Sequence, residues 1–66
     1  MTGREVLRVM QARGCVVVRQ RGSHVRVRCG RCETTVPMHA GRDLAPGTLR
    51  AIERDCEPCL GPRWLR

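Results

Sequence analysis

Two histidines are the residues of this chain best suited to moving protons. His24 follows Gly22 and Ser23 and opens the run HVRVRC, and His39 lies in the run VPMHAG. An imidazole has an ordinary pKa of about 6.5, so it can accept and release a proton near neutral pH. One well-placed general acid or base accelerates a reaction by about 10²- to 10⁴-fold. The alternatives are that His24 is ordinary solvated surface and that His39 simply caps a loop.

Arginines accompany His24 on one side of a predicted strand. Because side chains alternate along a strand, His24, Arg26 and Arg28 share one face, while the intervening valines and Cys29 share the other. The 13 basic residues are all arginine and the net charge is +7, which favours a polyanion or an acidic protein as partner. A solvated face that only keeps the protein in solution is the alternative.

The aromatic content limits how such a chain could hold a nucleic acid. There is no Phe and no Tyr, and Trp64 stands almost at the C-terminus. Modules that read single strands by base stacking need aromatic platforms, which this sequence cannot build. An RNA partner would therefore be held by its shape and its phosphates. On RNA, a histidine could transfer the proton of the ribose 2′-hydroxyl while guanidinium groups stabilise charge on the phosphate.

Four of the five cysteines form two Cys-x-x-Cys pairs. Such a double pair is typical of a tetrahedral zinc site, although the gap between the pairs is slightly longer than usual here. The pattern predicts a structural Zn²⁺ bound by four thiolates, with no open position for catalysis, from Cys29, Cys32, Cys56 and Cys59. Separate buried cysteines, two disulfides or a redox dithiol are the alternatives. Cys15, the fifth cysteine, is predicted to fill a small buried position.

Two amphipathic segments predict helices at either end of the chain. Thr2 and Glu5 have the spacing of a capping box, an apolar stripe follows, and Gly14 supplies the stop. The second helix is expected to start near residues 46–48 and to run to about Asp55, because a Glu-Pro pair follows.

Between the helices, β-branched and alternating runs predict three strands, over residues 15–21, 24–29 and 33–38. Tight turns join them into an antiparallel sheet. Both helices can bury their apolar stripes only against one face of this sheet, which makes a two-layer α+β domain with the His24 face left open.

The 66 residues form one domain, with a core over 2–59 and a tail over 60–66. A core this small often needs a stabilising cross-link, which a zinc ion bound between the sheet and the second helix would supply.

Three short motifs stand in a familiar order within the runs TGREVLRVMQARGCVVVRQRGSHVRV and TTVPMHAGRDLAPGTLRAI. They are Gly-Ser-His after the first strand, V-P-x-H-x-G after the third, and G-T-L-R at the start of the second helix. In this order and spacing, over roughly residues 2–55, the chain resembles the HicA-type toxins of bacterial toxin–antitoxin systems. It departs from them at Cys15, where the family commonly has an aromatic residue, and in its Cys-x-x-Cys pairs, which are not part of the general pattern.

The resemblance implies a double-stranded-RNA-binding-like α-β-β-β-α fold and a metal-independent endoribonuclease that cleaves mRNA. It also implies neutralisation by a HicB-like antitoxin, which we expect to cover the His24 face. The catalytic histidine of the family, in its Gly-Ser-His motif, corresponds to His24. The expected RNA-binding residues are Gly22, Ser23, Arg26, Arg28 and His39. No cofactor is expected in catalysis, and the predicted zinc is structural only.

Two other functions fit the same residues. One is a non-catalytic RNA-binding module of the same fold stabilised by zinc. The other is a protein-interaction domain, also stabilised by zinc, whose basic face binds an acidic partner.

The chain shows no signal-peptide pattern and no apolar run of the roughly 18 residues that span a bilayer, so no membrane partner is expected. A cytoplasmic location follows, where thiols stay reduced.

Overall fold

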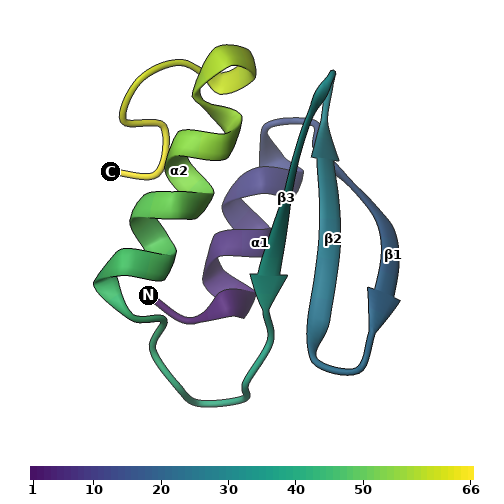
Figure 1. Cartoon of the computed structure of the whole chain (residues 1–66), viewed down its shortest axis with the longest axis vertical. Coiled ribbons are helices and arrows are strands. Elements are labelled where there is room, and N and C mark those ends of the chain that lie inside the picture. Colours follow the sequence, from purple (N-terminus) through teal and green to yellow (C-terminus); the bar gives the residue numbers. More distant parts are fainter.

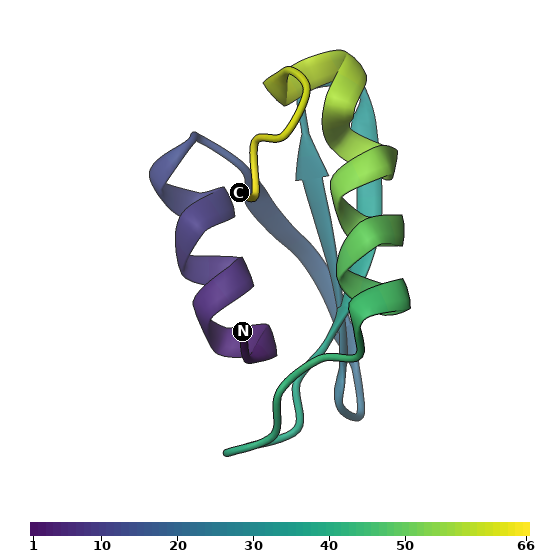
Figure 2. The same ribbon diagram turned by 90° about the vertical axis from the view of Figure 1, so that its left-hand side faces the viewer.

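The order of elements is helix, three strands, helix. A computed structural model describes all 66 residues, with the elements α1 (Gly3–Ala12), β1 (Val16–Arg21), β2 (His24–Cys29), β3 (Cys32–Pro37) and α2 (Pro46–Leu60). The strands form one antiparallel sheet in the order β1-β2-β3. Both helices lie on the same face of this sheet (Figures 1 and 2), which confirms the predicted α+β fold.

Helix α1 begins with the predicted capping box. The Glu5 amide donates to Thr2 Oγ1 at 3.1 Å, and the Thr2 amide donates to Glu5 Oε1 at 2.8 Å. These bonds lower the pKa of the Glu5 carboxyl group. Val6 and Met10, one turn apart, are fully buried beneath the helix. The capping box thus satisfies two of the amides that have no partner within the helix, while the apolar side of α1 packs on the sheet.

Gly3 lets α1 start directly against the end of β3. A Cβ atom at this position would overlap the carbonyl oxygen of Pro37, so only glycine permits the close approach. The start of α1 and the end of β3 are therefore in direct backbone contact.

The sheet buries one set of side chains and exposes the other, as the alternation predicted. Val25 and Val27 on β2 and Val36 on β3 are almost fully buried under the helices. A bulge between Val17 and Arg19 shifts the register of β1. The bulge puts Arg19 opposite an outward residue of β2 and so adds it to the open face.

Helix α2 continues further than the sequence predicted. It passes through Pro58 and ends at Leu60, whereas the expected end was near Asp55. A proline in the last turn removes only one amide donor, and the Gly61 amide still donates to Glu57 O at 2.8 Å. The extra turn carries Cys59, which is bonded to Cys32 of β3 and holds this end of the helix on the sheet.

The predicted zinc site is wrong. Cys15 is bonded to Cys29 and Cys32 to Cys59, while Cys56 is a free buried thiol. No group of three or more potential ligands could hold a metal ion.

The pairing follows from the register of the sheet. Val16 lies opposite Arg28, so the next pair along the two strands is Cys15 and Cys29, whose Cα atoms are 4.3 Å apart. Cys15 is therefore bonded to Cys29, which the predicted zinc site needed as a ligand. Burial raises the pKa of the remaining Cys56 thiol, which favours its protonated form.

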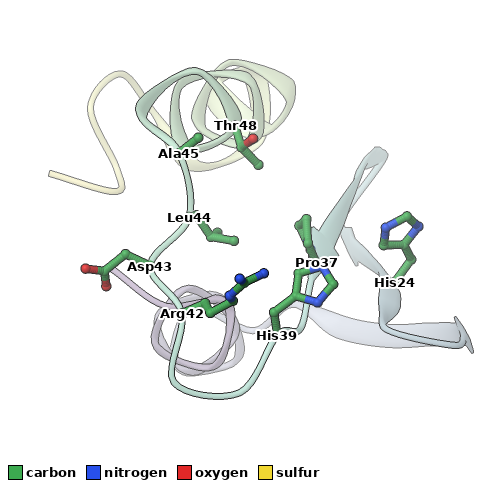
Figure 3. A pocket seen from close by; sticks show the side chains of 8 residues that line it. All are labelled: His24, Pro37, His39, Arg42, Asp43, Leu44, Ala45 and Thr48. Atoms are coloured by element: carbon green, nitrogen blue, oxygen red, sulfur yellow. The ribbon is translucent and has the colours of Figure 1, made fainter.

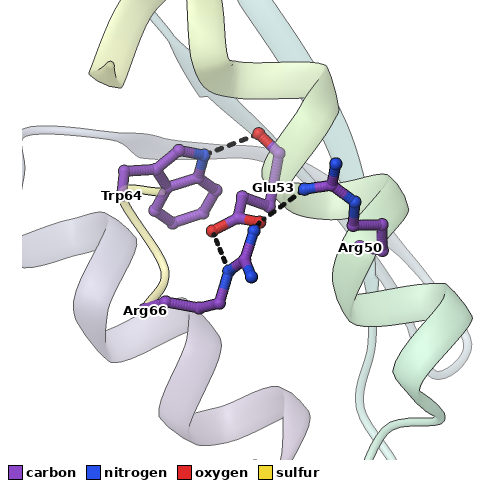
Figure 4. A network of polar contacts seen from close by, with 4 residues as sticks. All are labelled: Arg50, Glu53, Trp64 and Arg66. Atoms are coloured by element: carbon purple, nitrogen blue, oxygen red, sulfur yellow. Dashed lines mark hydrogen bonds and ion pairs between the residues drawn. The ribbon is translucent and has the colours of Figure 1, made fainter. Parts of the chain in front are cut away.

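The C-terminal tail folds back onto the helices and completes the core (Figures 2 and 4). Trp64 is buried, and its indole Nε1 donates to the backbone oxygen of Glu53 at 2.7 Å. The Glu53 carboxylate is also buried and forms ion pairs with Arg50 at 3.2 Å and Arg66 at 3.0 Å. The tail therefore supplies both the only large aromatic ring of the core and a cation for its buried acid.

We expect the pairing of Glu53 to make stability fall in acid. The hydrogen bond from Arg66 lowers the pKa of Glu53 below its ordinary value of 4.5, so folding favours the ionised form. This contribution is complete above the unfolded-state pKa and is lost as the pH falls through the lower, folded-state value. Thermal unfolding of the native chain should therefore shift to lower temperature below about pH 4.5. In Arg66→Gln the shift in this pH window should be smaller; an equal shift would contradict the role of Arg66.

Candidate active site

His24 lies on the face of the sheet that the helices leave uncovered, as predicted. It is the first residue of β2 and stands between Arg21 of β1 and Pro37 of β3. Its side chain is exposed and makes no hydrogen bond or ion pair with the rest of the chain. Both ring nitrogens are therefore available to a ligand.

Gly22 and Ser23 position His24 through their backbone. Gly22 has a φ of +58°, which the first central residue of this two-residue turn needs and which glycine adopts without strain. The carbonyl oxygen of Ser23 accepts a hydrogen bond of 2.6 Å from the Met38 amide, just beyond β3. The turn is thus tied to the end of β3, and the start of β2 is held on both sides.

The arginines of the open face are not equivalent. The Arg26 guanidinium donates to Glu33 Oε1 at 2.9 Å and to Thr35 Oγ1 at 3.0 Å, so part of its charge and two of its donors are used within the sheet. Arg28 is exposed and forms no ion pair, although Glu33 lies opposite it on β3. Of the two arginines predicted to bind RNA, Arg28 is therefore free to bind an anion, whereas Arg26 is also a structural residue.

One hollow brings the two histidines together. It has a volume of about 500 Å³ and is lined by His24, Pro37, His39, Arg42, Asp43, Leu44, Ala45 and Thr48. Figure 3 shows the two imidazoles at the same hollow, each next to Pro37. The predicted approach of His39 to the His24 region is thus present in the fold. The Asp43 carboxylate points away from the imidazoles and pairs with the amino terminus at 3.4 Å.

A tight turn places Arg42 beside His39. The Arg42 amide donates to the His39 carbonyl oxygen at 3.0 Å, and Gly41 has a φ of +72°. These are the features of a type II turn, whose third residue requires a positive φ. Two backbone contacts hold the end of this loop. Asp43 forms an isolated β-bridge with Thr2, and the Leu44 amide donates to the carbonyl oxygen of Met1 at 2.7 Å.

A second hollow lies on the other side of His24, over the strands. It has a volume of about 390 Å³ and no apolar lining residue; the lining consists of Arg19, Arg21, His24, Arg26 and Thr35. Since His24 lines both hollows, its imidazole stands at their junction. This arrangement joins a proton-transfer group to a strongly positive surface, as acid–base chemistry on a phosphodiester requires.

Residues 3–57 match a family model described as HicA toxin of bacterial toxin–antitoxin. The match covers most of the 66 residues. The chain belongs to the HicA toxin family. No curated protein and no solved structure was found to match this HicA-family chain. Neither of its helices is long and apolar enough to cross a membrane.

The predictions from sequence missed part of this candidate site. Arg42 and Thr48 reach the first hollow, and Arg19 and Arg21 line the second. For Arg42 the signal was Gly41, because a glycine two residues after His39 is typical of a turn that returns the chain beside its starting residue. For Arg19 no signal was available, since its direction depends on the bulge in β1.

Proposed function

We propose that this HicA-family chain is an endoribonuclease that cleaves mRNA without a metal ion. The observation that carries the proposal is the exposed imidazole of His24 at the junction of two hollows that are rich in arginine and histidine. A toxin acting on RNA needs a proton-transfer group beside groups that bind phosphate, and the imidazole of His24 with the guanidinium groups around it supports this assignment.

In the proposed reaction the ribose 2′-oxygen attacks the neighbouring phosphorus. His24 accepts the proton of the 2′-hydroxyl, the bond from phosphorus to the 5′-oxygen breaks, and that oxygen leaves with a proton from a second donor. The products are a 2′,3′-cyclic phosphate and a 5′-hydroxyl group. His39, in the same hollow, is the candidate for the second donor.

The phosphate is held by cations around His24. Arg26 lines the second hollow beside His24 and keeps donors beyond those bound by Glu33 and Thr35. Arg28, four residues further along β2, lines neither hollow and is a candidate for binding a more distant phosphate of the same RNA. Gly22 and Ser23 contribute by fixing the turn, and their backbone is close enough in sequence to His24 to contact the same nucleotide.

The partner of the toxin is proposed to be a HicB-like antitoxin that covers the open face of the sheet. Covering this face would block binding and cleavage together, since His24 and the free arginines lie on it. The proposed place of action is the cytoplasm, where mRNA is translated.

Cleavage of RNA in EDTA tests the function. The purified chain should cut a single-stranded RNA in the presence of excess EDTA and leave 2′,3′-cyclic phosphate ends. An oligonucleotide of the same sequence with 2′-deoxyribose throughout should stay intact, because it lacks the nucleophile. Binding of the RNA without any cleavage would support the non-catalytic binding module instead, and cleavage that stops in EDTA would contradict the metal-free reaction.

A further inference from the structure

The two hollows that meet at His24 define a path for the substrate. We propose that a single strand of RNA crosses the end of the sheet at His24, with one flanking nucleotide held by Arg19 and Arg21 and the other by Arg42. The inference rests on the proposed function in taking RNA as the ligand. It adds the course of the strand and three phosphate-binding arginines.

The position of His24 requires the substrate to extend in two directions. The imidazole lines the hollow over β1 and β2 and also the hollow beside the loop that follows β3. A group bound at His24 therefore has an open space on either side. A phosphodiester is continued by a nucleoside on both sides, so the surface matches an internal linkage rather than a terminal phosphate.

Arg42 is suited to bind the phosphate on the loop side. It is exposed and forms no ion pair, and its guanidinium points towards the His39 side of the hollow (Figure 3). The type II turn fixes its backbone, because the Arg42 amide is bonded to the His39 carbonyl oxygen. A fixed backbone and a planar fork of donors make an arginine an effective ligand for phosphate.

Arg19 and Arg21 are suited to bind the phosphate on the strand side. They alternate along β1 and point to the open face, opposite Arg26 and His24 in the register of the sheet. No carboxylate lines their hollow, and neither arginine forms an ion pair. The single acid nearby, Glu33, is bound to Arg26. The positive charge of the pair is therefore not neutralised within the chain.

The size and lining of the hollows favour an unpaired strand. Volumes of about 500 Å³ and about 390 Å³ fall in the range of sites for one small ligand, which suits one nucleotide each. In a duplex the bases are stacked and paired, so the nucleotides next to the cleaved linkage could not enter separate hollows. A flexible strand can also bring its 2′-oxygen, phosphorus and 5′-oxygen into line.

Binding of an uncleavable RNA tests the path without relying on cleavage. The probe is a fluorescent single-stranded oligonucleotide with 2′-O-methyl groups throughout, and the measurement is anisotropy at several salt concentrations. Arg42→Gln and Arg21→Gln should each weaken binding about tenfold, as expected for the loss of hydrogen bonds to a charged group. Each should also reduce the slope of log K against log salt by about 0.7.

Arg54→Gln is the matched control, because Arg54 is exposed on α2 and lines neither hollow. It should bind as the native chain does, and a duplex of the same sequence should bind more weakly than the single strand. Losses at Arg42 and Arg21 no larger than at Arg54, or equally tight binding of the duplex, would overturn the path. If the path variants behave as expected but the native chain cuts no RNA, the proposed function fails and the path stands.

Discussion

Replacing His24 by alanine should slow RNA cleavage by about 10²- to 10⁴-fold, the contribution of one general acid or base. The imidazole is exposed and makes no contact on which the fold depends, so the effect should fall on chemistry rather than on stability. The free arginines of the open face remain in the variant, and binding of uncleavable RNA should therefore change little. The measurement is the single-turnover rate constant at pH 7 with protein in excess over RNA.

Two controls separate chemistry from folding. The His24→Ala variant should unfold at the same temperature as the native chain. Gln11→Ala, which removes an exposed polar side chain from α1 on the other side of the molecule, should cleave at the native rate. A variant at His24 that cuts RNA as fast as the native chain would show that another group moves the proton. Equal losses of binding and cleavage would assign His24 to binding alone.

Removing the bond between Cys32 and Cys59 should have the largest effect on stability. This disulfide closes a loop with a sequence separation of 27 and joins β3 to the last turn of α2. Loss of such a bond from a small domain typically costs about 2–5 kcal/mol, and loop-closure entropy alone gives about 3.5 kcal/mol. The chain has a small core with one aromatic residue, so this is a large part of its stability. The measurement is chemical unfolding of the double variant Cys32→Ala/Cys59→Ala.

Cys56→Ala is the matched control, since it removes a buried thiol from the same helix without breaking a bond. It should cost less than the double variant, because only one sulfur atom is lost from the core. The denatured, unreduced chain should contain one titratable thiol. Five titratable thiols, or unfolding that a reductant leaves unchanged, would contradict the pairing. Stability should accordingly depend on the redox state of the surroundings.

The fold could be predicted because local and global signals agree. The capping box of Thr2 and Glu5, the period of two in HVRVRC and the glycines at the turns each specify one element without reference to the others. Once these elements form, each helix must bury its apolar stripe, and both can do so only against the same face of the sheet. The open position of His24 follows from that restriction, and the structure confirms it.

The chemistry of the cysteines could not be predicted, because it depends on contacts between distant segments. A Cys-x-x-Cys pattern specifies neighbours along the chain, whereas Cys15 reaches Cys29 through the register of two strands. The expectation also relied on a reducing compartment, which a sequence cannot establish. The end of α2 was misplaced for a related reason, since the bond at Cys59 and the packing of Leu60 stabilise a last turn that Pro58 alone would weaken.

The candidate site was predicted at its centre and missed at its edges. His24 and His39 were both marked by short motifs, and the fold brings them into one hollow. Arg42 depends on a turn that is marked in the sequence only by Gly41, and Arg19 depends on a bulge in β1 for which the sequence has no signal. Surface sites assembled from loop and strand residues therefore need the structure for their outer members.

Growth of bacteria after induction of the chain shows whether the His24 imidazole is required for toxicity. The native chain and His24→Ala are expressed from the same promoter without antitoxin, and colony-forming units are counted at equal protein levels. We expect the native chain to arrest growth and the His24→Ala variant to leave it unaffected. Arrest of growth by His24→Ala to the same extent as by the native chain would contradict this expectation.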